Sequence, residues 1–132
     1  LTIANRTLER AETLVDQFTE SYLESTDLNA CAYQELGRDK FDLIINGTSA
    51  GLNNEVPPLP DDILGINSIC YDMMYNTRQP TAFVKWAQER GALRAFDGLG
   101  MLVEQAAEAF FIWRGVRPDT TQLMTDLRKH PA

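Results

Sequence analysis

The chain has 132 residues and a formal net charge of −7, with 44% hydrophobic and 23% charged residues. This length supports one domain with a hydrophobic core, and the acidic balance argues against a broad nucleic-acid surface. No apolar run is long enough to cross a bilayer and no signal-peptide pattern is present, so we expect a soluble, cytoplasmic protein without membrane partners.

The first half of the chain alternates between strand-like and helix-like patterns. In chain order we expect a strand at residues 1–4, an amphipathic helix at 8–18, and strands at 29–33 and 41–46. The last of these runs is short and largely apolar, which is typical of a strand buried on both faces of a parallel sheet. Residues 51–60 contain three prolines and predict a loop.

The second half continues the alternation of strands and helices. We expect a strand at 68–73, a helix at 81–90, a strand at 93–96, and helices at 99–114 and 120–129. Glycines follow the first two of these helices, as is common at helix ends. The pattern predicts an α/β protein with a Rossmann-like, doubly wound, mostly parallel sheet and flanking helices.

Polar or glycine-containing turns follow four of the expected strands. They are residues 5–7, 46–49, 73–75 and 97–98. Ligands of doubly wound sheets bind at the carboxyl ends of the strands, so these turns outline a ligand cleft.

The first of these turns carries an unusual amount of positive charge. We expect Thr7 to cap the following helix, with Arg6 before the cap and Arg10 in the first turn. Two guanidinium groups oppose the positive end of a helix dipole, and a bound anion would turn that repulsion into attraction. Arginine at the end of the second strand of a dinucleotide-binding fold indicates NADP rather than NAD. Two solvated surface arginines are the alternative interpretation.

The glycine-rich phosphate loop of such folds is missing from the sequence. No Gly-x-Gly-x-x-Gly occurs, and the chain begins on a strand-like run without methionine. We therefore expect a partial NADP-binding domain, incomplete at its N-terminal edge, whose first strand, glycine loop and substrate domain lie upstream. An unpaired central strand edge would need cover from upstream residues or from another chain, for example in a homodimer.

Four stretches resemble the shikimate dehydrogenase family in sequence, order and spacing. They are residues 5–11, 42–51, 71–75 and 97–107. The last stretch is highly specific, whereas glutamyl-tRNA reductases share a motif like the first. The resemblance covers essentially the whole chain. It implies that the chain is the NADP-binding, C-terminal portion of a member of this family.

The resemblance also implies the residues of the site. The cofactor-binding residues would be Asn5, Arg6, Thr7, Arg10, Thr48, Ser49, Met73, Gly98 and Met101, and the substrate-binding residues would be Tyr75 and Gln105. The first four correspond to the adenosine ribose and its 2′-phosphate, the next two to the middle of the cofactor, and the last three to the nicotinamide end. By packing alone, Met73 and Met101 would be core residues.

The family reversibly reduces 3-dehydroshikimate to shikimate with NADPH in chorismate and aromatic amino acid biosynthesis. Its proton-transfer lysine and aspartate belong to the substrate domain, so we assign this chain no catalytic residue and no metal, and expect it to be inactive alone. A quinate/shikimate dehydrogenase paralogue and a non-catalytic NADP-binding module remain alternatives.

Cys31 and Cys70 lie in strand-like runs and are expected to be buried, reduced thiols.

Overall fold

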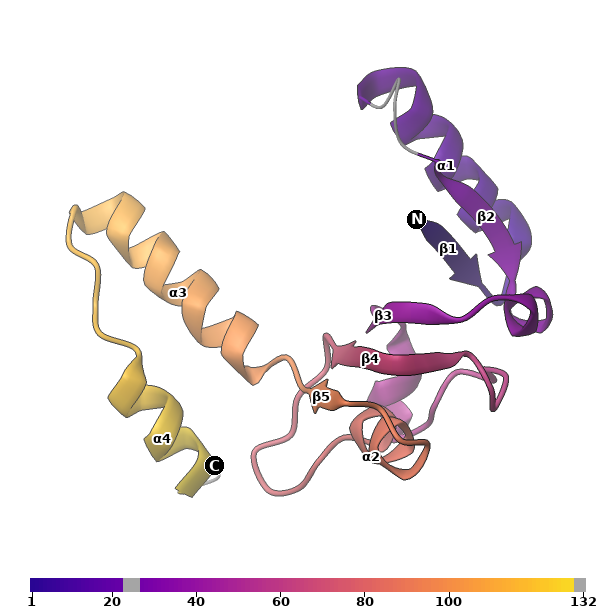
Figure 1. Ribbon diagram of the computed structural model, residues 1–132. Helices are drawn as coiled ribbons and strands as arrows, with labels where there is room; N and C mark the ends of the chain where they lie inside the picture. Colours follow the sequence, from indigo (N-terminus) through magenta and orange to yellow (C-terminus); the bar gives the residue numbers. More distant parts are fainter. Residues whose placement is uncertain (23–26, 130–132) are drawn as a thin grey trace. The chain divides into compact units, whose positions relative to one another are not determined.

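A computed structural model describes residues 1–22 and 27–129 (Figure 1). The chain divides into two compact units, one formed by Leu1–Lys40 and Pro58–Ile63, the other by Phe41–Pro57 and Leu64–Ala132. Each unit contains parallel strands and at least one α-helix, so the predicted α/β class is confirmed. Among the described residues, no helix has the length and apolar character needed to span a membrane.

The first unit is a strand–helix–strand arrangement. Strand β1 (Thr2–Asn5) pairs in parallel with β2 (Asn29–Ala32), and α1 (Leu8–Tyr22) lies between them in sequence. This is the crossover connection that parallel strands require. Ala11 is the buried contact of α1, whereas Leu14 and Phe18 on the expected apolar face are partly exposed. The helix continues four residues beyond its predicted end, because no glycine or proline interrupts residues 19–22.

A short 3₁₀ helix, η1 (Tyr33–Arg38), ends this strand arrangement and was not predicted. The Glu35 carboxylate accepts a hydrogen bond from the Ala32 N–H at 2.8 Å, so β2 stops one residue earlier than expected. Tyr33 and Leu36 are buried, and their burial holds the 3₁₀ turn in place.

The second unit is built on a three-stranded parallel sheet in the order β3–β4–β5. Its strands are β3 (Phe41–Asn46), β4 (Leu64–Asp72) and β5 (Arg94–Phe96). The bounds of β3 are those predicted, but β4 begins four residues earlier than expected. The Ser68 hydroxyl contacts the carbonyl oxygen atoms of Phe41 and Gly65, which keeps the polar start of β4 beside β3.

Helix α2 (Ala82–Glu89) connects β4 to β5 and forms much of the core of this unit. Its buried residues are Phe83, Val84, Trp86 and Ala87. The rings of Phe83 and Trp86 stack with centroids 5.3 Å apart. The helix ends as predicted, with Gly91 in the left-handed region at φ 82°.

The expectation that β3 is buried on both faces is wrong. Leu43 and Ile45 are 54% and 59% exposed. Alternating residues of a strand point to the same face, so these two side chains share one face. Within the described part of the chain, β3 pairs with β4 alone and its other edge has no strand neighbour. The apolar run therefore marks a strand whose second face is left open here.

Two helices follow β5 and match their predicted positions closely. Helix α3 (Leu99–Arg114) buries Leu99, Val103 and Ala107, which lie four residues apart on one face. It ends at Gly115, whose φ of 70° suits glycine. Helix α4 (Thr121–Lys129) has no buried residue among those described.

Candidate functional site

The same local turn ends four of the strands. An Asn or Asp side chain follows or closes each strand, and its Oδ1 accepts the backbone N–H two residues later. The pairs are Asn5 to Thr7 at 3.0 Å, Asn46 to Thr48 at 3.1 Å, Asp72 to Met74 at 3.2 Å and Asp97 to Leu99 at 3.2 Å. Such turns end a strand because the side chain takes the place of the next backbone hydrogen bond between neighbouring strands. The residues enclosed by them are Arg6, Gly47, Met73 and Gly98, three of which were predicted site residues.

In the first unit, the turn after β1 presents two arginines at the start of α1. The Arg6 and Arg10 side chains are exposed, and within residues 1–22 and 27–129 neither forms an ion pair. The Thr7 cap was wrongly predicted, because Asn5 supplies the side-chain hydrogen bond of this turn while the exposed Thr7 hydroxyl makes none with described residues. Both guanidinium groups are thus available to an anion at the positive end of a helix.

Tyr33 supports this turn from the end of β2. Its side chain is buried, which raises the pKa of the phenol, while the nearby Arg6 guanidinium and a hydrogen bond from the Arg6 backbone oppose that rise. Tyr33 therefore lies near Arg6, at the turn that precedes α1.

In the second unit, a buried carboxylate joins the ends of β3 and β4 to the start of α2. Asp72 is fully buried and accepts hydrogen bonds from Asn46 Nδ2 at 3.0 Å and Thr81 Oγ1 at 2.5 Å, besides the Met74 N–H. Thr81 in turn caps α2 by accepting the Val84 N–H. No buried polar side-chain atom in the described part of the chain lacks a partner. The network is therefore a rigid support for the neighbouring turns.

The turn at Thr48 belongs to this support. The Thr48 hydroxyl donates to Asn46 Oδ1 at 2.8 Å and accepts the Ala50 N–H at the start of η2 (Ser49–Asn53). This 3₁₀ helix overlaps the start of the predicted loop. Because the Thr48 hydroxyl is engaged in the turn, the neighbouring Ser49 hydroxyl, which bonds to no described residue, is the freer ligand group.

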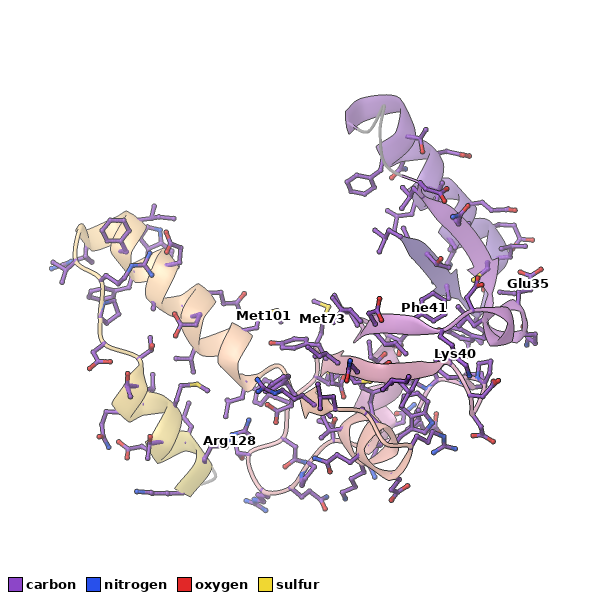
Figure 2. All side chains as sticks on the ribbon, viewed as in Figure 1. Glu35, Lys40, Phe41, Met73, Met101 and Arg128 are labelled. Carbon is purple, nitrogen blue, oxygen red and sulfur yellow. The ribbon has the colours of Figure 1, made fainter. Side chains whose placement is uncertain are left out.

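Gly98 lies against the backbone at the end of β4. A Cβ at this position would overlap the Met73 carbonyl oxygen, so only glycine fits. The Gly98 N–H donates to the Met74 carbonyl at 2.9 Å, which binds the β5–α3 turn directly to the β4 end. Met73 at the end of β4 and Met101 at the start of α3 (Figure 2) are 45% and 37% exposed, so neither is a core residue.

The two predicted substrate-binding side chains are also accessible. Tyr75 is exposed beyond the end of β4, and Gln105 is exposed one turn after Met101 on α3. The other polar residues of this stripe have partners, since Glu104 accepts the Thr120 hydroxyl and Glu108 pairs with Arg117. Gln105 has no hydrogen-bond partner among the described residues, which leaves its amide available to a ligand.

Sequence reasoning missed an ion pair beside this turn. Arg128, which Figure 2 labels on α4, donates to both carboxylate oxygens of Asp97, at 2.6 and 2.8 Å. This interaction raises the pKa of the guanidinium. The partners lie 31 residues apart. No local sequence pattern links the two residues. The position of Asp97 directly after an apolar strand could have indicated a carboxylate that needs a hydrogen-bond donor.

A cavity of about 560 Å³ lies on the same unit but is largely separate from the predicted contacts. It is lined by residues of the 76–80 loop together with Tyr71, Phe96, Met101, Met124 and Arg128. Of the predicted site residues, Met101 alone lines it. The candidate site is thus a set of strand-end turns and not an enclosed pocket.

Neither cysteine contributes to the site. Both cysteines are free thiols; Cys70 in β4 is buried as expected, whereas Cys31 in β2 is only half-buried, contrary to the expectation. Burial raises the pKa of Cys70 to about 11. A thiol with so high a pKa is unreactive near neutral pH. No group of three metal-ligating side chains was found in the described parts of the chain.

Sequence comparisons with known proteins find similarity to shikimate dehydrogenases. A profile described as "Shikimate 5'-dehydrogenase C-terminal domain" matches residues 98–126. The shikimate dehydrogenase (NADP(+)) of Alkalilimnicola ehrlichii is 55% identical over 126 residues, and that of Cellvibrio japonicus is 50% identical over 127. Each alignment covers 96% of this chain and 44% of the relative, so the chain spans less than half the length of these proteins.

Solved structures share the fold. An Ael1 enzyme from Pseudomonas putida is 44% identical with a TM-score of 0.80, and the alignment covers 96% of this chain and 45% of that one. The Thermus thermophilus shikimate 5-dehydrogenase in complex with NADP(H) and shikimate is 26% identical, with a TM-score of 0.74 and coverage of 97% and 45%. A 5-ketofructose reductase from Gluconobacter is 30% identical, with a TM-score of 0.75 and coverage of 97% and 46%.

These matches extend over nearly the whole chain, and the Rossmann-like neighbours agree with the predicted fold class. They also agree with the resemblance seen in the four sequence stretches, of which the stretch at 97–107 overlaps the matched family profile. By sequence and by structure, nearly the whole chain is similar to part of the shikimate dehydrogenases, and its residues 98–126 match the C-terminal domain of that family.

Proposed function

We propose that this chain forms the NADP-binding part of a shikimate dehydrogenase. The observation that carries the proposal is the pair of exposed arginines without ion-pair partners among the described residues, Arg6 and Arg10, at the start of α1. The 2′-phosphate of NADP brings up to two negative charges, which guanidinium groups bind through charge-assisted hydrogen bonds. The names of the curated relatives include NADP(+), which supports the same cofactor.

The remaining proposed cofactor contacts fall into three groups. In the first unit, Asn5 and Thr7 flank Arg6 at the adenosine ribose. In the second unit, Thr48 and Ser49 contact the middle of the cofactor. The nicotinamide end is contacted by Met73, Gly98 and Met101, where the exposed thioethers offer an adaptable apolar surface and the glycine a close backbone approach.

For the substrate, we propose contacts from Tyr75 and Gln105. A phenol and a primary amide both donate and accept hydrogen bonds, which suits the hydroxyl groups of shikimate or 3-dehydroshikimate. In the whole enzyme, a hydride passes between the nicotinamide and the substrate carbonyl carbon. These side chains would orient the substrate for that transfer. We assign no proton-transfer residue to this chain and expect the 132 residues alone to show no NADP-dependent shikimate oxidation.

The cofactor assignment is tested by removing the positive charge of Arg6. We expect Arg6→Gln to weaken NADP⁺ binding by roughly ten- to a hundredfold, since one charge-assisted contact contributes about 1.5–3 kcal/mol. NAD⁺, which lacks the 2′-phosphate, should bind the two proteins equally. Isothermal titration calorimetry on the purified chain measures both ligands.

Arg94→Gln is the matched control, because Arg94 is an exposed arginine on β5 outside the proposed contacts. An equal loss of NADP⁺ affinity in both variants would show a general charge effect and reject the site. Equal affinities of the unaltered chain for NADP⁺ and NAD⁺ would reject the cofactor assignment itself.

The substrate remains the finer part of the proposal, since a 5-ketofructose reductase shares this fold. A quinate/shikimate dehydrogenase paralogue and a non-catalytic cofactor-binding module differ from the proposal in ligand response. With NADP⁺ bound, shikimate should shift the side-chain amide resonances of Gln105 in NMR spectra and quinate should shift them less. The order would reverse for a quinate enzyme, and neither ligand would shift the Gln105 resonances of a non-catalytic cofactor-binding module.

We also propose a cytoplasmic location.

A further inference from the structure

We infer that Arg128 is a positioning residue, which fastens α4 to the β5–α3 turn and thereby holds Gly98 and Met101 in place for the cofactor. This inference rests on the proposed function, because those two residues are the proposed contacts to the nicotinamide end. Among the described residues, Arg128 forms no hydrogen bond with Gly98 or Met101, and it acts through its two hydrogen bonds to Asp97.

The Asp97 carboxylate joins two helices. Its Oδ1 accepts both the Leu99 N–H in the first turn of α3 and Arg128 Nη2, while Oδ2 accepts Arg128 Nη1. The Asp97 side chain is only 5% exposed, whereas Arg128 is 45% exposed. The carboxylate is therefore shielded from water, and the guanidinium supplies most of its hydrogen bonds. A two-bond fork of this kind requires the planar geometry of arginine.

Helix α4 has few other attachments within the described residues. None of its residues is buried, and the preceding Thr120 donates a single bond to Glu104 at 2.6 Å. The Met124 methyl lies 3.8 Å from where a Cβ would stand at Gly100, which is ordinary van der Waals contact. Because Met124 and Leu127, its most buried residues, are only half-buried, the Arg128–Asp97 fork is a main attachment of α4.

The turn held by this fork is the one that meets β4. Gly98 packs on the Met73 carbonyl and donates to Met74, and Met101 follows within the first turn of α3. A turn that is already ordered loses less conformational freedom when a ligand binds. Releasing α4 would loosen residues 97–101 and raise the entropic cost of binding the nicotinamide end.

The first measurement needs no ligand. Hydrogen–deuterium exchange is compared among the unaltered chain, Arg128→Gln and Lys129→Gln, a control that removes the same charge one residue away. We expect faster exchange over residues 99–101 and 121–129 in Arg128→Gln alone. Unchanged exchange in that variant would overturn the fastening role, whatever the chain binds.

The second measurement separates the two ends of the cofactor. We expect Arg128→Gln to weaken NADP⁺ binding by about fivefold, the change expected for one partly exposed ion pair, without altering the affinity for adenosine 2′,5′-bisphosphate. Equal weakening of both ligands would indicate a general structural defect and overturn the inference. Failure of the unaltered chain to bind either ligand would instead overturn the proposed function.

Asp97→Asn provides an independent check, because the amide keeps Oδ1 for the Leu99 N–H but loses the charge. It should reproduce the exchange and binding pattern of Arg128→Gln, and the double variant should be no worse than either single variant. Additive effects of the two substitutions would show that they act separately and would contradict the fastening pair.

Discussion

At the residue scale, two glycines near the β5–α3 turn leave different amounts of room for a side chain. The backbone of Gly98 lies so close to the Met73 carbonyl that any Cβ would overlap it. Gly100, two residues later, faces only the flexible end of Met124 at 3.8 Å. Two glycines in one short motif thus have different physical roles, which their spacing in the sequence does not reveal.

We predict opposite effects on stability for alanine at these two glycines. Gly98→Ala should lower the free energy of unfolding by at least about 2 kcal/mol, because the backbone must shift to admit the methyl group. Gly100→Ala should raise it by up to about 1 kcal/mol, because alanine is the better helix former in α3. Urea denaturation measures both, and a destabilised Gly100→Ala of the same size would contradict the distinction.

At the element scale, the position of α2 depends on its N-terminal cap. Thr81 accepts the Val84 N–H and donates to the buried carboxylate of Asp72. One hydroxyl therefore starts the helix and satisfies a charge at the end of β4. The cap could be predicted from the sequence, since threonine commonly precedes a helix. Its second partner, nine residues earlier in the chain, could not.

We predict that Thr81→Ala lowers the free energy of unfolding by about 2–3 kcal/mol, which combines the loss of a helix cap with an unsatisfied buried acceptor. Thr81→Ser keeps the hydroxyl and should cost less than about 1 kcal/mol. Thermal or urea unfolding followed by circular dichroism checks both variants. Equal destabilisation by alanine and serine would show that the methyl group, and not the hydroxyl, matters.

At the scale of the whole molecule, each sheet has strand edges without a described neighbour. β1 pairs with β2 alone, and β3 pairs with β4 alone. The face of β3 that carries Leu43 and Ile45 is also exposed. Open strand edges beside apolar side chains favour association with further protein chain. We therefore propose that additional polypeptide, in this or another chain, covers the β3 edge.

We predict that the purified 132-residue chain associates with itself in a concentration-dependent way. The double variant Leu43→Thr/Ile45→Thr should weaken this association, because threonine keeps the strand propensity but removes apolar surface. Ile66→Thr is the control, since Ile66 is 96% exposed near the start of β4. Sedimentation velocity measures the association, and a monomer at all concentrations would contradict the prediction.

The sequence by itself determined the local features of this protein. The order of the α-helices and strands, the bounds of β3 and α3, the parallel α/β class, the glycine ends of α2 and α3 and the charged turn at Arg6 all follow from patterns a few residues long. The end of α1, the start of β4 and the two 3₁₀ helices did not follow from such patterns. The resemblance in four short stretches also predicted the similarity to shikimate dehydrogenases that the comparisons show, because motif order and spacing are properties of the chain alone.

The tertiary structure decided which of those local features meet. The exposed face of β3, the burial of Asp72 and the pairing of Arg128 with Asp97 depend on residues 9 to 31 positions apart, or on which strands become neighbours. Burial and hydrogen bonding depend on surroundings that distant segments create. The sequence therefore does not distinguish a carboxylate that faces water from one that accepts three hydrogen bonds. For that reason the sequence predicted the turns at the site, whereas the contacts that hold them in place emerged only from the fold.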